Sequence, residues 1–324
     1  MKAVARTLYG SADVLQFVDV NKPAVADNEV LIRVHAAGAG PEVWHLMTGR
    51  PYLVRVMGFG LRKPKNPILG TDVAGVVEAV GREVTELRTG DAVFGTCAGS
   101  FAEYASARAD DVAPKPTNLT LEQAAVLPTS GCTALQGLRD VGRIEAEQSV
   151  LIIGASGGVG TFAVQLAKAF GAEVTGVCRT NAIELVRSLG ADHVIDYTRD
   201  DFADGVHRYD LILDTAGRRS LTHLRRALTP HGTLVIVGGE GGGRWTGGFE
   251  RQIVRATVLS IVVRQRLRPL TSTARRKDLL ALKEFAEAGK LTPVISKSCP
   301  LREAAKALSD ANEGHGRGKV VITI

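Results

Sequence analysis

A glycine-rich segment contains the residues whose types and spacing point most directly to chemistry. Residues 154–160 read Gly-Ala-Ser-Gly-Gly-Val-Gly, directly after the apolar run 150–153 and before apolar residues at helical spacing. Gly157 would let the backbone approach a pyrophosphate, and Gly160 would let a helix pack closely on the strand. The helix N-terminus would add free N–H groups and partial positive charge. In this strand-turn-helix context the segment predicts dinucleotide binding, whereas elsewhere the same glycines would indicate only a tight turn.

The end of the next expected strand indicates which dinucleotide is bound. An NAD-selective site usually has an acidic residue there for the ribose 2′-hydroxyl. The strand ends in Val177-Cys178-Arg179, and the first acidic residue after it is Glu184. Arg179 can pair bidentately with a 2′-phosphate. We therefore predict NADPH as the cofactor; the alternative is that Arg179 is a solvated arginine after a strand.

The cysteines and histidines are not spaced for a metal site or a disulfide framework. The four cysteines stand at 97, 132, 178 and 299, and the seven histidines include no His-x-x-x-His or His-Glu-x-x-His pair. Thiolate zinc sites and disulfide frameworks need closer or denser spacing. We expect reduced, mostly structural thiols and no catalytic metal.

The elements around the glycine-rich segment alternate between strand and helix. Strands are expected at the short apolar runs 150–153, 174–177, 193–195, 211–213, 234–237 and 258–263, with helices between them, as at 161–170 and 182–189. Parallel strands need such helical crossovers. Residues 123–269 therefore predict an α/β fold with a doubly wound parallel sheet, a Rossmann dinucleotide-binding domain.

The rest of the chain has the sequence pattern of a β domain. Residues 29–35 alternate between apolar and polar side chains, and glycine-bounded runs at 70–81 and 90–95 add further strands. After a helix near 277–288, strands are expected at 291–295 and 319–324. We expect these last strands to return to the first domain. That domain would then be discontinuous and barrel-like, formed by residues 1–122 and 270–324.

Length and composition exclude several classes of protein. The 324 residues suit about two domains, and 45% hydrophobic residues argue against general disorder. The apolar runs are too short to span a bilayer and the N-terminus has no signal-peptide core, so we expect a cytoplasmic protein without a membrane partner. The net charge of +6 is modest and the basic clusters lack interleaved aromatic residues, so no nucleic-acid partner is expected.

Over nearly its whole length the chain resembles the medium-chain dehydrogenase/reductase superfamily, and within it the zinc-free NADPH:quinone oxidoreductase branch. The segments that carry the resemblance are 36–38 (Ala-Ala-Gly), 70–77 (GTDVAGVV), 90–93 (GDAV), 127–134 (LPxxGxTA), 155–160 (ASGGVG), 189–192 (LGAD), 214–217 (DTAG) and 315–321 (HGRGKVV). It implies a GroES-like catalytic domain built from both chain ends, a Rossmann domain, and a cleft that joins them.

The resemblance also implies an enzyme that works without zinc. Zinc-dependent relatives have a Cys shortly after the Ala-Ala-Gly segment and a His-Glu pair after the glycine that stands at 70. This sequence has Gly40 and Thr71-Asp72 at those positions, and it lacks the four-cysteine structural lobe. A catalytic zinc needs about three protein ligands, and at most Asp72 remains. Zinc-free relatives often carry Asn-Pro-x-Asp where this chain has Gly40-Pro41-Glu42-Val43, so a role for that Asn is not transferred.

Further site residues follow from the resemblance. Tyr52, in Thr48-Gly49-Arg50-Pro51-Tyr52, matches a tyrosine that lines the family's active site and would donate a hydrogen bond to a carbonyl oxygen gaining charge, with packing as the alternative. Thr129 and Thr133 are expected beneath the nicotinamide, with helix capping as the alternative. The other expected cofactor contacts are Ser156, Gly157, Gly158, Val159, Gly160, Cys178, Arg179, Tyr197, Ala216, Gly217, Gly238, Gly239 and Lys319. The basic segment 53–65 is expected to be a solvated loop. The alternatives are that it caps the cleft or that it presents cations to an acidic substrate.

The implied function is hydride transfer from NADPH to a quinone or another α,β-unsaturated carbonyl. Such small-molecule acceptors delocalise charge onto oxygen, so one hydrogen-bond donor can suffice without a metal. The alternatives are a metal-free alcohol dehydrogenase and a non-catalytic NADPH-binding protein with a basic surface for RNA or a protein. We also expect a homodimer joined through the strand at 258–263, because an unpaired apolar edge strand invites association.

Overall fold

The computed structural model describes residues 1–238, 256, 259–260, 263–312 and 317–324. These residues form two compact units. Unit 1 consists of Met1–Cys132, Ala274–Gly289 and Pro293–Ile324, and unit 2 consists of Thr133–Thr273 and Lys290–Thr292. Unit 1 is thus built from three separate stretches of the chain.

Unit 1 contains a seven-stranded sheet and a separate strand pair. In the larger sheet the order is β14-β15-β3-β4-β5-β7, with β6 paired to β3. Its strands are β3 (Glu29–Ala39), β4 (Asp72–Val80), β5 (Ala92–Thr96), β6 (Tyr104–Arg108), β7 (Val112–Pro114), β14 (Ile295–Pro300) and β15 (Lys319–Thr323), while β1 (Lys2–Ala5) and β2 (Gln16–Asp19) form the antiparallel pair. Its helices are α1 (Pro41–Thr48), α2 (Leu121–Ala125), α8 (Arg276–Glu287) and α9 (Ala304–Asn312), and α3 (Pro128–Gln136) continues into unit 2.

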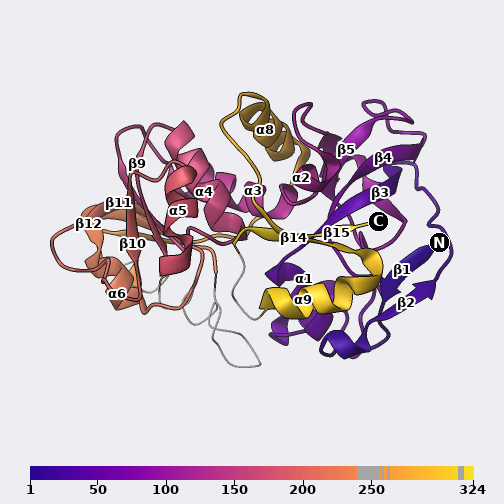
Figure 1. The fold of residues 1–324 in the computed structure, drawn as a ribbon, viewed down its shortest axis with the longest axis horizontal. Coiled ribbons are helices and arrows are strands. Elements are labelled where there is room, and N and C mark those ends of the chain that lie inside the picture. The colour runs from indigo at the N-terminus through magenta and orange to yellow at the C-terminus, as the bar shows by residue number, and fades with distance from the viewer. Residues whose placement is uncertain (239–255, 257–258, 261–262, 313–316) are drawn as a thin grey trace. The chain divides into compact units, whose positions relative to one another are not determined.

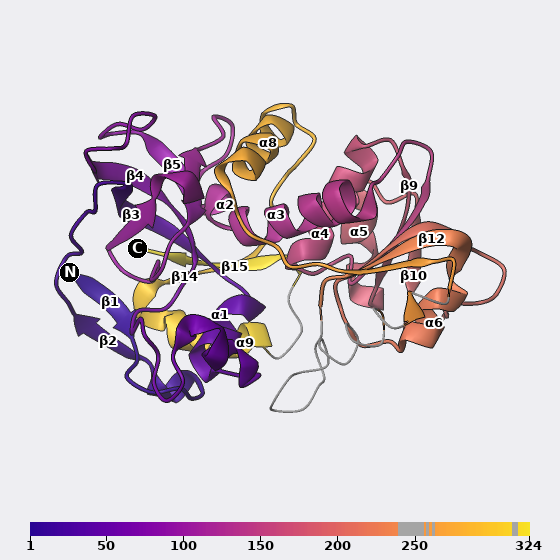
Figure 2. The ribbon, with the colours of Figure 1, turned by 180° about the vertical axis from the view of Figure 1, so that it is seen from behind.

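The C-terminal strands return to unit 1, as the sequence predicts. β15 pairs antiparallel with β3 and parallel with β14, and Figures 1 and 2 show the yellow strand β15 beside β3. The strand expected at 291–295 begins only at Ile295, as β14. Pro293 lacks the N–H group that a ladder requires, which explains the later start.

Alternation along β3 sets the core of this sheet. Val30, Ile32 and Val34 are buried together in one apolar cluster, whereas Arg33 and His35 are exposed. A strand with one buried face has a strongly specified register, because a slip of one residue would turn the apolar face to water.

Unit 2 contains a six-stranded parallel sheet of order β10-β9-β8-β11-β12-β13. Its strands are β8 (Ser149–Ile153), β9 (Glu173–Cys178), β10 (His193–Asp196), β11 (Tyr209–Asp214), β12 (Leu228–Ile236) and β13 (Arg266–Pro269), and its helices include α4 (Gly158–Ala169), α5 (Ile183–Ser188) and α6 (Leu221–Arg226). The order reverses at β8, and such sheets bind ligands at the carboxyl ends of the strands beside this switch point. The predicted doubly wound α/β fold is confirmed.

The last strand of the unit 2 sheet lies later in the chain than predicted. Of the run 258–263, residues 258, 261 and 262 lie outside the described residues, whereas Leu259 is helical and the sixth strand is β13. A short apolar run does not distinguish a strand from a buried helical segment, which explains the error. In β13 Leu267 is buried between the exposed Arg266 and Arg268. Charged side chains on an edge strand discourage pairing, so this edge does not support the expected mode of dimerisation.

In the part of the chain that the structure describes, no helix is long and apolar enough to cross a membrane.

Candidate active site

The turn after β8 has the shape of a phosphate-binding turn. Gly157 is the N-terminal cap of α4, and no side chain caps this helix, which leaves its first N–H groups to a ligand or to water. A Cβ on Gly160 would lie 2.0 Å from the carbonyl oxygen of Gly154, so only glycine lets α4 start this close to β8. A Cβ on Gly157 would meet only the same oxygen, at 3.3 Å. Gly160 is therefore needed for packing, whereas Gly157 leaves open space beside the helix N-terminus.

We expect Gly160→Ala and Gly157→Ala to fail in different ways. Gly160→Ala forces its methyl carbon against the backbone at Gly154, so it should destabilise the fold by about 1–3 kcal/mol, as overpacking does. Gly157→Ala should leave Tm nearly unchanged and weaken nucleotide binding about tenfold, because the new methyl group occupies the approach to the helix N-terminus. Thermal melts and fluorescence titrations with NADPH measure the two effects. Equal losses of Tm would show that both glycines serve packing alone.

Two expected cofactor residues meet at neighbouring strand ends. Arg179 follows β9 and Tyr197 follows β10, and the Arg179 Nε donates a hydrogen bond to the Tyr197 hydroxyl at 2.5 Å. Both side chains are exposed, and no residue in the described ranges accepts a hydrogen bond from the Arg179 Nη groups. Tyr197 also borders a hollow of about 270 Å³ that is lined by Thr198, Arg199, Asp200, Asp201 and Arg219. The carboxyl ends of β9 and β10 thus offer an aromatic ring and cations to a ligand.

The carboxylate nearest to this edge is already engaged. Asp196, the last residue of β10, accepts hydrogen bonds from the Thr180 hydroxyl, from the Thr198 N–H at 3.0 Å and from the Thr198 hydroxyl at 2.7 Å. The Thr180 bond is the largest of the effects that lower the pKa of Asp196. Asp196 is therefore ionised, and its carboxylate oxygens accept hydrogen bonds from neighbouring residues.

Asp214 shapes the turn at the end of β11. Its Oδ1 accepts hydrogen bonds from the N–H groups of Ala216 at 3.1 Å and Gly217 at 3.0 Å, and Gly217 has the positive φ of 64° that favours glycine. Burial raises the pKa of Asp214 against the effect of these two bonds. A Cβ on Gly238 would lie 2.5 Å from the Thr215 carbonyl oxygen. The ends of β11 and β12 therefore meet in a contact that admits no larger side chain.

A buried ion cluster lies in unit 1. Lys319, the first residue of β15, is 4% exposed, and its Nζ lies 2.7 Å from the Asp72 Oδ2 and 3.3 Å from the Glu42 Oε1. The Asp72 Oδ1 accepts hydrogen bonds from the Thr129 N–H at 3.2 Å and from the Thr129 hydroxyl. Desolvation lowers the pKa of Lys319, but the carboxylates of Asp72 and Glu42 outweigh it and raise this pKa above its usual range. Lys319 is thus a charged ammonium group held out of water.

This cluster occupies the two positions singled out as replaced zinc ligands. Asp72 binds the ammonium group, and a Cβ on Gly40 would lie 2.3 Å from a Glu42 carboxylate oxygen, so glycine at 40 makes room for that carboxylate. Among the described residues no three His, Cys, Asp or Glu side chains are grouped so that they could hold a metal ion. The residues present at this position therefore do not fit a zinc ion.

Tyr52 lies in a turn that packs against the end of α1. Gly49 ends this helix with φ of 59°, and the following Arg50–Pro51 peptide is cis. The Arg55 Nε donates to the Gly49 carbonyl oxygen at 2.9 Å. The guanidinium carbon of Arg55 lies 4.7 Å from the centre of the Tyr52 ring, close enough for a cation–π interaction. The end of α1 therefore holds the Arg55 guanidinium in place, and this group orients Tyr52 by packing on the face of its ring.

The structure brings the expected residues into two groups. At the strand ends and the glycine-rich turn of unit 2 lie Ser156, Gly157, Gly158, Val159, Gly160, Cys178, Arg179, Tyr197, Ala216, Gly217 and Gly238. Burial raises the pKa of the Cys178 thiol to about 11, so this side chain is an inert thiol. Unit 1 holds Tyr52, Thr129 and Lys319, and Thr133 follows Thr129 one turn later on α3. Gly239 lies outside the described residues.

Sequence reasoning missed the partners of Lys319. The resemblance assigns this lysine to the cofactor, but its Nζ contacts two carboxylates of unit 1 and is nearly inaccessible. Glu42 was not a candidate at all. The available signal was a lysine that opens an otherwise apolar terminal strand, since a buried charge needs a partner.

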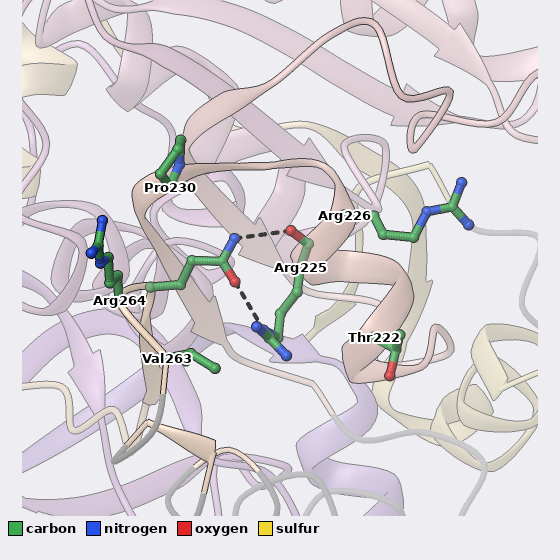
Figure 3. A pocket seen from close by; sticks show the side chains of 7 residues that line it. Thr222, Arg225, Arg226, Pro230, Val263 and Arg264 are labelled. Carbon is green, nitrogen blue, oxygen red and sulfur yellow. Dashed lines mark hydrogen bonds between the residues drawn. The ribbon is translucent and has the colours of Figure 1, made fainter.

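A second hollow in unit 2 has a different lining. It measures about 370 Å³ and lies at the end of α6, where β12 and β13 begin, lined by Thr222, Arg225, Arg226, Pro230, Val263, Arg264 and Gln265 (Figure 3). The Arg225 Nε donates to the Gln265 Oε1 at 2.9 Å, and the Gln265 Nε2 donates to the Arg225 carbonyl oxygen at 3.0 Å. Because it lies where these strands begin, this hollow is at the edge of the sheet opposite to the glycine-rich turn.

Known proteins resemble this chain over its whole length. Residues 26–117 match the family model described as alcohol dehydrogenase GroES-like domain, and residues 189–322 match the one described as zinc-binding dehydrogenase. The chain is 34% identical to 2-methylene-furan-3-one reductase of Solanum lycopersicum, over 99% of this chain and 79% of that protein. It is 31% identical to the quinone oxidoreductase of Homo sapiens, over 100% and 98% of the two chains. The quinone oxidoreductase structure from Coxiella burnetii matches with a TM-score of 0.88 and 30% identity, over 100% of this chain and 99% of that one.

Proposed function

The chain belongs to the medium-chain dehydrogenase/reductase superfamily, and from this we propose that it is a zinc-independent reductase that transfers hydride from NADPH to a quinone or another α,β-unsaturated carbonyl. Oxidoreductases of this superfamily use nicotinamide cofactors. The observation that carries the proposal is the glycine-lined switch point of unit 2, where an added Cβ would fill the space beside an uncapped helix N-terminus. Two relatives named quinone oxidoreductase and one named for reduction of a conjugated ketone support the class of acceptor.

The choice of NADPH rests on the charges at the ends of β9 and β10. Arg179 presents its Nη groups beside Tyr197, and Arg199 lines the adjacent hollow. Asp196, which could otherwise repel a 2′-phosphate or bind a ribose hydroxyl, is engaged by Thr180 and Thr198. A 2′-phosphate would therefore meet the Nη groups of Arg179 at this edge, whereas NADH has no group to use them. The Arg199 Nε lies 3.8 Å from the Asp196 Oδ2 and Arg199 shares the hollow with Asp200 and Asp201, so the choice of cofactor rests on Arg179.

The mechanism assigns separate tasks to the two units. The nicotinamide cofactor supplies the hydride. The first N–H groups of α4 would hold the pyrophosphate of a bound cofactor, and the turn built by Asp214 would keep bulky side chains away from its nicotinamide half. Tyr52 donates a hydrogen bond to the acceptor oxygen as negative charge develops on it, and solvent completes the protonation. Lys319 is fixed between Asp72 and Glu42, so the carboxylate at 72, one of the positions where zinc-dependent relatives have ligands, holds an ammonium group instead.

Tyr52→Phe should lower the maximal rate about tenfold. A donor aimed at a developing oxyanion contributes about 2.7–4 kcal/mol in a dry site, and a quinone that delocalises its charge needs less of this stabilisation. The loss should be larger for enones, whose enolate is the stronger base. Steady-state assays of NADPH oxidation with a quinone and an enone measure both losses.

The control for this variant is cofactor affinity. Phenylalanine preserves the ring that packs against Arg55, so NADPH binding should stay within about twofold of the parent. If Tyr52→Phe reduces both acceptors at the parental rate, the residue serves packing only.

Two further parts of the proposal concern the setting of the enzyme. A reducing compartment such as the cytoplasm suits four cysteines that form no disulfide. We also propose a homodimer, as expected from the sequence. Because the edge strand β13 exposes charged side chains, it does not provide an apolar dimer interface.

A further inference from the structure

A stretch of unit 1 combines exposed apolar side chains with unpaired cations. Between Glu42 and Asp72 the sequence has five Lys or Arg residues and no Asp or Glu. Within it, residues 56–65, the apolar–basic loop, expose three large apolar side chains: Val56 is 67%, Phe59 47% and Leu61 69% exposed. Arg62, Lys63 and Lys65 of the same loop are exposed as well. None of these three cations forms an ion pair with any residue in the described ranges.

The apolar–basic loop is held in this shape by contacts within it and by Tyr9. The expected solvated loop at 53–65 is helical over residues 53–59, so Val56 and Phe59 lie on a short π-helical turn, Arg55–Phe59. The Tyr9 hydroxyl lies 2.9 Å from the Phe59 carbonyl oxygen and 2.7 Å from that of Gly60. The Lys65 N–H donates to the Phe59 carbonyl oxygen at 2.9 Å, and a Cβ on Gly60 would lie 2.1 Å from the Lys63 carbonyl oxygen. The chain therefore folds back tightly after Phe59. Its apolar side chains are presented to solvent by a hydrogen-bonded turn.

The composition of this loop favours a lipid surface over a protein partner. Single exposed apolar residues are common, but three within six residues beside free cations are the combination that interfacial segments use. Apolar side chains enter the boundary between headgroups and acyl chains, while Lys and Arg meet anionic headgroups. A stable protein interface buries about 800 Å² on each partner, which is more than three side chains on one turn can offer.

We propose that the apolar–basic loop docks this protein on an anionic lipid surface. The attachment is peripheral and reversible, since the apolar surface is small and the described chain has no membrane-crossing helix. The three cations of the loop supply the specificity, because they attract anionic lipids and gain little from neutral ones. Docking itself does not depend on the proposed reductase activity. If that activity is right, docking brings the enzyme to quinones dissolved in the bilayer.

Sedimentation of the full chain with lipid vesicles tests the proposal. Vesicles of phosphatidylglycerol and phosphatidylcholine should bind the protein, and binding should fall with added salt, whereas pure phosphatidylcholine should bind little. Lys63→Gln should weaken binding about fivefold, the effect of one cation at an anionic surface. Phe59→Ser should weaken binding by at least about fivefold, because it removes an inserted side chain.

Matched variants in unit 2 serve as controls. Val206→Ser removes an apolar side chain that is 78% exposed, and Lys290→Gln removes an exposed cation; neither should change vesicle binding. Thermal melts of all four variants should agree with the parent, so that a change in vesicle binding is not a loss of fold.

Three results would overturn the proposal. The first is no binding to anionic vesicles at low salt, and the second is equal losses in the loop variants and in the unit 2 controls. The third is a change in NADPH affinity, substrate KM or molecular mass for Phe59→Ser without vesicles, which would make the loop a lid or a protein contact. Because vesicle binding is measured without substrate, a failure of the reductase proposal leaves this test unaffected.

Discussion

Arg179→Ala is expected to weaken NADPH binding about ten- to a hundredfold and to change NADH binding little. A charge-assisted hydrogen bond contributes about 1.5–3 kcal/mol, and only NADPH carries a phosphate at the ribose 2′ position to receive it. Arg179 stands at the end of β9 with its Nε bonded to the Tyr197 hydroxyl, so its Nη groups are the ones available to the phosphate. Fluorescence titrations with each cofactor measure the two affinities.

Two variants separate charge from geometry at this position. Arg179→Lys keeps the charge but loses the planar fork, so its NADPH affinity should fall between those of the parent and Arg179→Ala. Tyr197→Phe keeps the ring but removes the hydroxyl that orients the Arg179 Nε. Its loss of NADPH affinity should therefore be smaller than the loss in Arg179→Ala. If Arg179→Ala weakens NADPH and NADH equally, Arg179 supports the fold of the edge and does not select the cofactor.

Local patterns were sufficient to predict the strand, turn and helix around the glycine-rich segment of unit 2. The apolar run 150–153 is β8, and the glycines after it open α4, because strand, turn and helix each have a short-range signature. The position of Arg179 at the end of β9 also followed from the local pattern, whereas Tyr197 was expected only from the family resemblance; the parallel pairing of β9 with β10 brings the two strand ends to one edge of the sheet.

Contacts between distant segments were beyond local patterns. Lys319 and Asp72 are 247 positions apart, and only the pairing of β15 with β3 and of β3 with β4 brings the starts of β15 and β4 together. The misplaced strand at 258–263 failed for a related reason. An apolar run predicts that a segment is buried. Whether the segment is a strand or a helix depends on the elements that pack against it, which the run does not specify.

Lys319→Met is expected to destabilise unit 1 by about 3–5 kcal/mol, the loss typical when one partner of a buried ion pair is removed. The methionine leaves the buried Asp72 without its cation, and Thr129 alone cannot balance that charge. Asp72→Asn should cost less, because Lys319 keeps Glu42 as a partner. Urea denaturation followed by circular dichroism measures each free energy of unfolding.

The dependence on pH follows from the same charges. In the parent the pKa of Lys319 is raised, so its contribution is complete below the unfolded value of about 10.4 and is lost only as pH rises through the higher folded value. The contribution of Lys319 to the stability of the parent should therefore not change with pH near neutrality. In the parent, burial already raises the pKa of Asp72 against the opposing effects of Lys319 and Thr129. Removing the cation in Lys319→Met should raise this pKa further, so the folded state binds an extra proton and the variant should regain stability as pH falls from 8 to 5.

The double variant Lys319→Met/Asp72→Asn distinguishes a missing charge partner from a missing side chain. Replacing both members of a buried ion pair with neutral groups is often close to neutral for stability, so the double variant should recover much of the loss. The pH dependence that comes from Asp72 should disappear, whereas Glu42 remains as a carboxylate without its cation. Additive losses in the two single variants would mean that the side chains contribute packing independently, because uncoupled sites add. A large coupling between them would show that the ammonium group is retained to balance the carboxylates. The ion pair of Asp72 and Lys319 would then be a requirement of the fold of unit 1, because the buried carboxylate is not tolerated without the ammonium group.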